Sequence, residues 1–287
     1  QVIAEDLPGK PPDPGHWIHY ARGGWVDPGA LVRWWLATPG VTWRGRCDVA
    51  LLRRVQPGPE DLATGWELLD AQGSVLAQAP VVVLALGSGL GSWPGLEQPS
   101  RPPPWKGKPL WPITPVRGQV TWFDADDAIA WPVSGQGYAV RLPTGKMLCG
   151  ATSAPEDPDI AVRETDHAHN LERLRALTGL APPLGAALGG RVGWRAVTPD
   201  RLPLIGAVPR LAGASPTEQT RFVPREPGLF VVGGYGSRGL TWAALGGEIL
   251  TAWLEGTPAP LEGDLLDAVD PARFAVRAWR RAARDAP

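Results

Sequence analysis

The segment that decides the fold is 229–256, which begins LFVVGGYGSRGL. Its first four residues are all apolar, as in a strand that is covered on both faces. A helix is predicted over Leu240–Leu254, with Gly256 as its C-terminal cap. Between strand and helix lie the glycines Gly233, Gly234, Gly236 and Gly239. They leave backbone amides bare beside a helix start, which favours a flat or anionic ligand, although a plain Gly-rich turn has the same letters.

A second run, Val81–Leu86, is also apolar at every position and predicts a strand of the same sheet. It ends in Gly87-Ser88-Gly89, so two strand ends carry glycines, as expected for a dinucleotide site at the carboxyl edge of a doubly wound sheet. No G-x-G-x-x-G follows an N-terminal strand, and the nearest pattern in the N-terminal half of the chain, 87–91, leads into Ser92-Trp93-Pro94. We therefore expect the βαβ unit that binds a pyrophosphate to be missing from this chain.

Alternating apolar and polar residues characterise the middle of the chain, after a Pro-rich connection at 99–115. The strands expected there are Arg117–Phe123, Gly137–Leu142 and Lys146–Ala151. One helix interrupts them, with Thr165 as its cap and leucines at every third position. Ahead of the connection, Asp27 and Pro28 predict a helix start, and 47–79 predicts an antiparallel meander.

This order of elements predicts an α/β (α+β) fold with two interleaved domains. A partial Rossmann-like domain is expected to combine 1–98 with 226–287. A mostly antiparallel β-sheet domain is expected at 99–225, and we assign substrate binding to it.

Composition and charge exclude several functions. A net charge of −1 creates no whole-molecule field that would recruit nucleic acid or a membrane, so an RNA contact needs a local patch. Cys47 and Cys149 are too few for a disulfide framework or a Cys-based metal site, so we expect reduced thiols and no metal. The histidines lack a neighbouring ligand cluster and are expected to be exposed. No apolar stretch reaches membrane-spanning length, and we expect a cytoplasmic protein.

A third motif lies at 193–206, where the chain reads GWRAVTPDRLPLIG. This pattern resembles the glycine oxidase/D-amino-acid oxidase superfamily of FAD-dependent oxidoreductases. The resemblance implies that Arg195 binds the substrate carboxylate above the flavin, a role that suits the two parallel hydrogen bonds of a guanidinium. A surface arginine in a Pro-rich turn is the alternative interpretation. Arg117 and Arg238 are the next candidates for the carboxylate anchor.

Other blocks extend the resemblance almost from end to end; they lie at 23–28, 115–119, 137–138, 150–152 and 236–240. The resemblance implies FAD as the cofactor, bound by the domain formed from 1–98 and 226–287. Residues expected at the cofactor are Gly87, Ser88, Gly89, Gly234, Gly236, Ser237, Arg238, Gly239, Leu240 and Thr241. Tyr138 and Tyr235 are expected to line the substrate site.

The C-terminal segment 264–274, DLLDAVDPARF, is similar to a narrower group, the bifunctional tRNA 5-methylaminomethyl-2-thiouridine biosynthesis proteins. This likeness implies oxidative removal of the carboxymethyl group from a carboxymethylaminomethyl-uridine at the tRNA wobble position. Hydride would pass from the substrate to the flavin, the imine would hydrolyse, and O2 would reoxidise the flavin to give hydrogen peroxide. The methyltransferase domain of the bifunctional proteins is not expected in this chain, and we expect the isolated chain to bind FAD poorly.

Two alternatives remain open. A small-molecule glycine or D-amino-acid oxidase would produce an imino acid and hydrogen peroxide. A non-catalytic fragment would retain only a substrate- or RNA-binding fold. The tail arginines fit contacts to tRNA phosphates and equally a solvated helix face; they are Arg273, Arg277, Arg280, Arg281 and Arg284.

Overall fold

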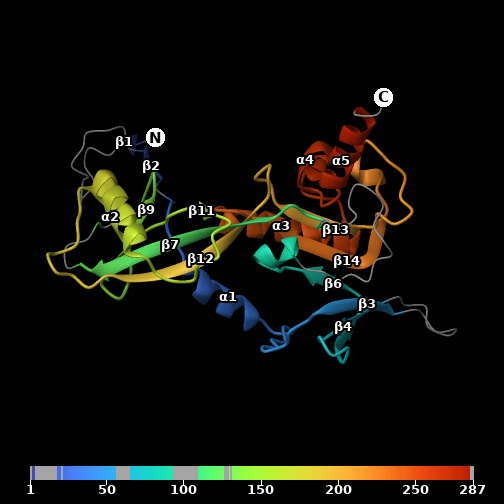
Figure 1. Cartoon of the computed structure of the whole chain (residues 1–287), viewed down its shortest axis with the longest axis horizontal. Helices are drawn as coiled ribbons and strands as arrows, with labels where there is room; N and C mark the ends of the chain where they lie inside the picture. Colours follow the sequence, from blue (N-terminus) through green and yellow to red (C-terminus); the bar gives the residue numbers. More distant parts are fainter. Residues whose placement is uncertain are drawn as a thin grey trace. The chain divides into compact units, whose positions relative to one another are not determined.

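The computed structural model describes residues 2–3, 18–20, 22–55, 65–92, 109–125, 129 and 131–284 (Figure 1). The chain divides into two compact units, each built from more than one segment. Unit 1 comprises residues 1–41 and 116–194, and unit 2 comprises residues 42–115 and 195–287. These bounds differ from those expected from the sequence. One domain was expected to combine 1–98 with 226–287, and the other was expected at 99–225. The assignment of FAD-binding and substrate-binding domains to those ranges stays a prediction.

A mostly antiparallel sheet forms the larger part of unit 1 (Figure 1). Its strands are β7 (Thr114–Asp124), β8 (Val133–Ser134), β9 (Tyr138–Arg141), β10 (Lys146–Gly150), β11 (Ala154–Pro155) and β12 (Gly189–Val197). They run in the order β11-β7-β10-β9-β8, and β12 also pairs with β7. Cys149 in β10 lies opposite Thr121 in β7 on one side and opposite Ala139 in β9 on the other. The three strands expected from the alternating pattern are confirmed.

Helix α2, Glu164–Thr178, contacts this sheet through β10, β9 and β8. Leu174 is buried there in an apolar cluster that also contains Phe123, Met147 and Cys149. Burial raises the pKa of the Cys149 thiol to about 11, so the thiol stays protonated at neutral pH. Cys149 and Cys47 are both free, as expected.

The two helix starts in unit 1 differ in how they are capped. Helix α1, Pro28–Leu36, begins as predicted, because Oδ1 of Asp27 accepts hydrogen bonds from the amides of Gly29 (2.8 Å) and Ala30 (3.1 Å). The expectation that Thr165 caps α2 was wrong. No side chain of its own caps α2; instead the amide of Arg163, at the cap position, donates to Oε1 of Gln119 in β7 (2.8 Å).

Unit 2 contains the sheet that the two apolar runs predict. Its strands are β13 (Leu204–Pro209), β14 (Arg225–Gly233) and β6 (Val82–Leu84), in the order β13-β14-β6. β14 runs parallel to β6, with Leu229 opposite Val82 and Val231 opposite Leu84. The expectation that 81–86 and 229–232 lie in one sheet is therefore confirmed. β13 pairs with β14 in an antiparallel orientation and so belongs to this sheet. From the sequence, β13 was expected to belong to the antiparallel domain at 99–225.

Two smaller sheets accompany these. The antiparallel meander expected at 47–79 is confirmed as β3 (Leu51–Val55), β4 (Gly65–Leu69) and β5 (Val75–Ala79) in unit 2. In unit 1, β1 (Val2–Ile3) pairs antiparallel with β2 (Ile18–His19).

The helices of unit 2 are α3 (Gly239–Glu255), α4 (Gly263–Val269) and α5 (Arg273–Arg284), with short 3-10 turns η1 (Gly87–Gly91) and η2 (Thr220–Phe222). Gly256 ends α3 in the left-handed conformation, as predicted. Helix α5 places Ala275, Val276 and Trp279 in the same apolar core as β14. Helix α5, the last helix among the described residues, is therefore part of the core of unit 2.

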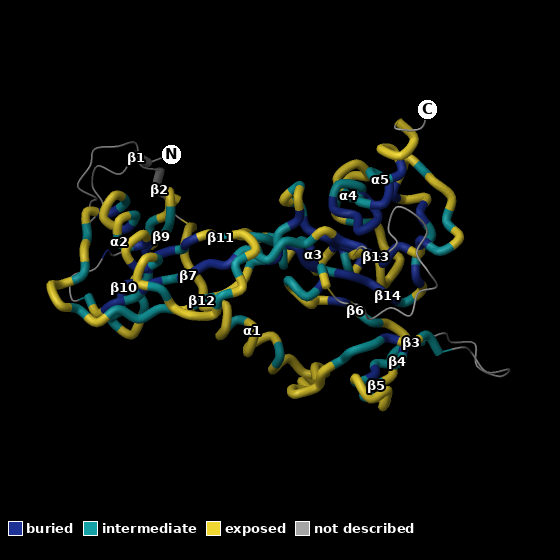
Figure 2. Tube along the Cα trace, viewed as in Figure 1, coloured by how far each residue is buried: buried dark blue, intermediate teal, exposed yellow. Residues whose placement is uncertain are grey.

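Burial separates the two apolar strands of this sheet (Figure 2). In β14, Leu229 and Val231 are fully buried and Phe230 is nearly so, as expected for a strand covered on both faces. In β6, only Leu84 is buried, whereas Val83 stays 37% exposed. The expectation of burial on both faces was wrong for β6, because the described residues of the chain cover only one of its faces.

Candidate functional site

The glycine-rich turn between β14 and α3 lies at the carboxyl end of the central strand of the sheet in unit 2. Gly234 and Gly236 have φ of 69° and 57°, a left-handed region that strains residues with a side chain. Helix α3 has 17 residues and starts directly after this turn, at Gly239, and no side chain caps it. The first-turn amides of a helix have no partner within the helix, so they remain available as donors, aided by the helix dipole.

The second predicted glycine segment packs against this turn. It forms η1, and the Leu90 side chain within it is buried. A Cβ atom placed at Gly233 would lie 2.4 Å from Cδ1 of Leu90, so a side chain at Gly233 would clash with η1. Around Gly87 no atom lies within 4 Å of such a Cβ position, and its φ is 56°. The structure thus brings the carboxyl ends of β6 and β14 together, as the parallel pairing requires.

The end of β12 is the third segment at this turn. The amide of Gly236 donates to the carbonyl of Ala196 (2.9 Å), and Val197 forms an antiparallel bridge with Tyr235. Arg195 is the residue before Ala196 and is half-buried. Arg195 therefore lies near the end of β12, next to the residue that is hydrogen-bonded to the glycine-rich turn.

The two other candidate arginines have different surroundings. Arg117 is fully buried in unit 1, where its donors are taken by Asp166 and by backbone carbonyls. This engagement makes Arg117 a structural residue rather than a substrate anchor. Arg238 is exposed at the cap position of α3, next to the bare amides.

The two tyrosines expected to line the substrate site lie in different units. Tyr235 packs against α3, where a Cβ atom at Gly246 would lie 2.5 Å from its hydroxyl oxygen. Burial raises the pKa of Tyr235, so its hydroxyl stays protonated at neutral pH. Tyr138 begins β9 in unit 1, opposite Gly150 of β10. A substrate-binding role for either tyrosine stays a prediction.

A charged cluster that was not predicted holds the turn after Arg195. Oγ1 of Thr198 donates to the carbonyl of Leu202 (2.6 Å), and the amide of Leu202 donates to Asp200 (3.2 Å). Arg273 of α5 donates to both oxygens of Asp200, at 2.9 Å and 3.1 Å, and Arg277 adds a third hydrogen bond at 2.5 Å. Burial alone would raise the pKa of Asp200, but the hydrogen bonds and charges of Arg273 and Arg277 outweigh it and hold the pKa well below its ordinary range.

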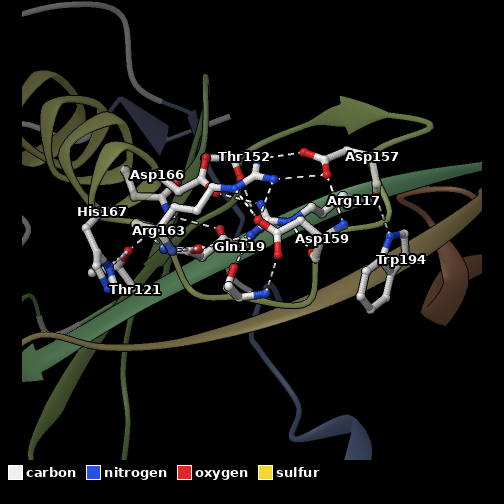
Figure 3. A network of polar contacts seen from close by, with 12 residues as sticks. Arg117, Gln119, Thr121, Thr152, Asp157, Asp159, Arg163, Asp166, His167 and Trp194 are labelled. Atoms are coloured by element: carbon white, nitrogen blue, oxygen red, sulfur yellow. Dashed lines mark hydrogen bonds and ion pairs between the residues drawn. The ribbon is translucent and has the colours of Figure 1, made fainter.

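Unit 1 has a polar network of its own, centred on Arg117 (Figure 3). Its Nε and Nη atoms donate to the carbonyls of Asp159 (2.7 Å) and Ala161 (2.5 Å) and to the carboxylate of Asp166 (2.6 Å). Gln119 binds both the amide and the carbonyl of Arg163. The network therefore fastens residues 157–163 and the start of α2 to β7.

The same network reaches β12 and a buried histidine (Figure 3). The indole nitrogen of Trp194 donates to the carbonyl of Asp157 (2.8 Å). His167 was expected to be exposed, which was wrong: it is 2% exposed, and its Nδ1 lies 2.8 Å from Oγ1 of Thr121. The histidine is buried because a polar side chain of β7 supplies its hydrogen-bond partner.

The residues at the turn of unit 2 fit the isoalloxazine side of FAD. The amides at the start of α3 suit the C2 carbonyl and N1 of the flavin, which become negatively charged on reduction. Gly234, Gly236 and Gly87 keep side chains away from this surface. Within the part of the chain that the structure describes, no group of three or more His, Cys, Asp or Glu could hold a metal ion. In the same described part, no helix combines the length and apolar character needed to cross a membrane.

Residues 2–253 match the family described as FAD dependent oxidoreductase (DAO), and the chain belongs to this family. FAD is therefore its cofactor. Among its curated relatives is the tRNA 5-methylaminomethyl-2-thiouridine biosynthesis bifunctional protein MnmC of Methylibium petroleiphilum, 45% identical over 98% of this chain and 43% of that protein. The protein of the same name from Burkholderia pseudomallei is 42% identical over 93% of this chain and 40% of its own length. The chain spans less than half the length of these relatives.

Solved structures share the fold at lower identity. Glycine oxidase from Geobacillus kaustophilus has a TM-score of 0.55 and 20% identity, over 79% of this chain and 52% of that chain. Iminodiacetate oxidase from Chelativorans sp. has a TM-score of 0.54 and 20% identity, over 77% and 52%. These neighbours confirm the mixed α/β fold class that the sequence predicts.

Proposed function

We propose that this chain catalyses the FAD-dependent oxidative removal of the carboxymethyl group from a carboxymethylaminomethyl-uridine at the tRNA wobble position. The observation that carries the proposal is the 45% identity, over almost the whole chain, to a relative named for tRNA 5-methylaminomethyl-2-thiouridine biosynthesis. The proposed substrate contains an amine bearing a CH2–COO⁻ arm. Glycine and iminodiacetate contain the same unit, and oxidases named for them share this fold.

Arg195 supports this chemistry as the carboxylate anchor. It precedes Ala196, whose carbonyl accepts a hydrogen bond from Gly236 in the turn that leads into α3. A guanidinium fixes a carboxylate through two parallel hydrogen bonds, so it sets the direction of the methylene carbon as well as the position of the charge. Asp200, Arg273 and Arg277 fasten the turn that follows and limit the movement of Arg195.

The amides of Gly239, Leu240 and Thr241 at the start of α3 supply the second contribution. No side chain caps these amides, so they would be free to donate hydrogen bonds to the cofactor and to place partial positive charge where its negative charge develops. FAD, when bound, would supply the acceptor for the hydride that leaves the methylene carbon. Water then adds to the resulting imine and releases glyoxylate and the aminomethyl-uridine. We further propose O2 as the final electron acceptor and the cytoplasm, where tRNA is modified, as the location.

The test is single-turnover flavin reduction by the FAD-loaded protein with tRNA carrying either the carboxymethylaminomethyl group or the same amine without the carboxylate. Arg195→Ala should cost about 2–5 kcal/mol in transition-state stabilisation for the carboxylate substrate only, because the bound carboxylate loses its charged partner. Arg195→Lys should recover part of this, since an ammonium cannot form two parallel hydrogen bonds to a carboxylate. Arg210→Ala serves as the matched control, because it removes an equal charge from an exposed position of the same unit that is outside the candidate site.

Two results would contradict the proposal in different ways. A mutant that keeps the wild-type preference for the carboxylate substrate would remove Arg195 from the anchor role. Efficient glyoxylate production from free glycine, with none from the modified tRNA, would instead assign the chain to the small-molecule oxidases.

A further inference from the structure

Helix α5 has two sharply different sides. Its apolar residues Ala275, Val276 and Trp279 are buried in the core of unit 2. Arg280, Arg281 and Arg284 are exposed, and 273–284 contains no acidic residue. We call these three exposed arginines the arginine face.

The arginines of α5 fall into two groups by their partners. Arg273 and Arg277 are paired with Asp200. Arg280 donates to the backbone carbonyl of Glu218, which carries no charge. Among residues 2–284 as far as the structure describes them, no carboxylate forms an ion pair with a member of the arginine face. Within the described residues, the face therefore presents three positive charges to solvent without a carboxylate paired to any of them.

We propose that the arginine face binds backbone phosphates of the tRNA substrate, an inference that rests on the proposed function. Guanidinium groups match phosphate oxygens in geometry and charge, and release of counterions from the nucleic acid drives such binding. The protein as a whole has a net charge of −1, so RNA needs a local basic surface to approach it. A lipid surface fits poorly, because the apolar side of α5 is already buried in the core.

The position of α5 relative to the candidate site strengthens the inference. Arg273 and Arg277 belong to the same helix as the arginine face, and they grip Asp200 in the turn that begins at Thr198. That turn follows Arg195 within the same unit. A phosphate held by the arginine face is thus connected through one helix and one ion cluster to the strand end that carries the proposed carboxylate anchor.

The test replaces Arg280, Arg281 and Arg284 together by Gln in the FAD-loaded protein. A matched control replaces three exposed arginines of unit 1, Arg33, Arg141 and Arg175, by Gln, so both variants have the same net charge. Binding of modified tRNA is measured by fluorescence anisotropy over a range of salt concentrations. Turnover is measured on the modified tRNA and on the isolated modified nucleoside, which has no backbone phosphate. Thermal unfolding checks that both variants fold.

We expect the α5 variant to bind tRNA at least about tenfold more weakly, with a salt slope reduced by about two to three, roughly one for each phosphate that the variant no longer binds. Its turnover of the nucleoside should match that of the wild type, and the control should bind tRNA as the wild type does. Unchanged tRNA affinity and salt slope in the α5 variant would overturn the inference. An equally weakened control would also overturn it, because the effect would then reflect total charge.

Competition separates RNA from an acidic protein partner. Polyglutamate that displaces tRNA from the wild type at equal charge concentration would assign the face to acidic polypeptides and overturn the inference. Failure of the proposed function gives a different pattern, in which the wild type turns over neither the tRNA nor the nucleoside. The anisotropy measurement would still decide whether the arginine face binds RNA.

Discussion

Arg117 in unit 1 and Asp200 in unit 2 are both bound by several charged or polar partners. The central residue of the first cluster is a cation, and that of the second is an anion. In unit 1, one fully buried arginine meets a carboxylate and two backbone carbonyls, all from residues 159–166. In unit 2, one carboxylate meets two arginines of α5, and Arg277 remains 41% exposed. The arginine at the centre of the first cluster is closed to solvent, whereas the second cluster continues through Arg277 onto an exposed helix face.

The difference indicates what each cluster is for. A buried guanidinium whose donors are all used locally stabilises one arrangement of the chain and offers nothing to a ligand. A carboxylate shared by a buried and a half-exposed arginine fixes the turn beside Arg195 and also joins it to the surface. We infer that the cluster in unit 1 serves stability and that the cluster in unit 2 serves positioning.

The largest effect that would test this comparison is expected at Arg117. Arg117→Ala leaves Asp166 and two carbonyls without their partner in a closed site, and should lower the free energy of unfolding by about 3–5 kcal/mol. Denaturant unfolding measures the decrease, and hydrogen exchange should locate it in β7, β10 and α2. Arg53→Ala breaks the exposed pair with Glu67 and should cost less than about 1 kcal/mol. A decrease at Arg117 no larger than in this control would contradict the stabilising role.

A smaller decrease in stability is expected at Arg273. Arg273→Ala removes two hydrogen bonds to Asp200, but Arg277 remains, so the cost should be about 1.5–3 kcal/mol. The positioning role adds a second readout. The variant should raise KM for the carboxylate substrate more than it lowers kcat, whereas Arg117→Ala should change neither in the protein that stays folded. Equal effects of both variants on KM would show that the two clusters do not differ in role.

The smallest effect concerns pH. The pKa of Asp200 lies below its ordinary value of 3.8 in the folded chain, so its contribution to stability is present above that value and is lost as the pH falls toward the lowered pKa. Down to pH 3 the decrease should be about 1 kcal/mol, because the unfolded carboxylate takes up the proton first. Asp200→Asn lacks the ionisable carboxylate and should therefore lack this pH-dependent contribution to stability. The difference in unfolding free energy between wild type and variant should shrink on acidification. A difference that stays constant between pH 6 and pH 3 would show that ionised Asp200 does not stabilise the folded chain.

Local patterns in the sequence predicted the elements of this molecule well. The apolar run 229–232, the glycines after it and Gly256 defined β14 and α3, because each of these signals acts over a few residues. Asp27 identified the start of α1 for the same reason. These predictions needed no knowledge of distant partners.

Errors arose where a distant residue decides the outcome. Thr165 does not cap α2, because Gln119 of β7 binds the backbone at the helix start. His167 is buried because Thr121 supplies its partner. Val83 is exposed although its run is wholly apolar, since the described residues cover one face of β6 only.

The glycine segments and Arg195 were selected from their motifs, and their roles at the cofactor and the substrate stay predictions. The structure shows that a hydrogen bond from Gly236 to Ala196 joins the glycine-rich turn to the strand that contains Arg195. The hydrogen bonds from Arg273 and Arg277 to Asp200 could not be predicted, because they connect residues far apart in sequence. An arginine-rich helix gives no sign of which arginines are paired and which face solvent.

The parallel pairing of β6 with β14 has a consequence for the order in which the chain can assemble during synthesis. Val82 leaves the ribosome long before its partner Leu229, and the core that both strands share also needs Trp279, which follows Leu229 in the sequence. The segment 116–194 of unit 1, by contrast, is complete while much of unit 2 is still unmade. A newly made chain therefore carries β6 without its partner β14 until residues 225–233 have been made, a period in which exposed strand edges favour aggregation and chaperones have most to protect.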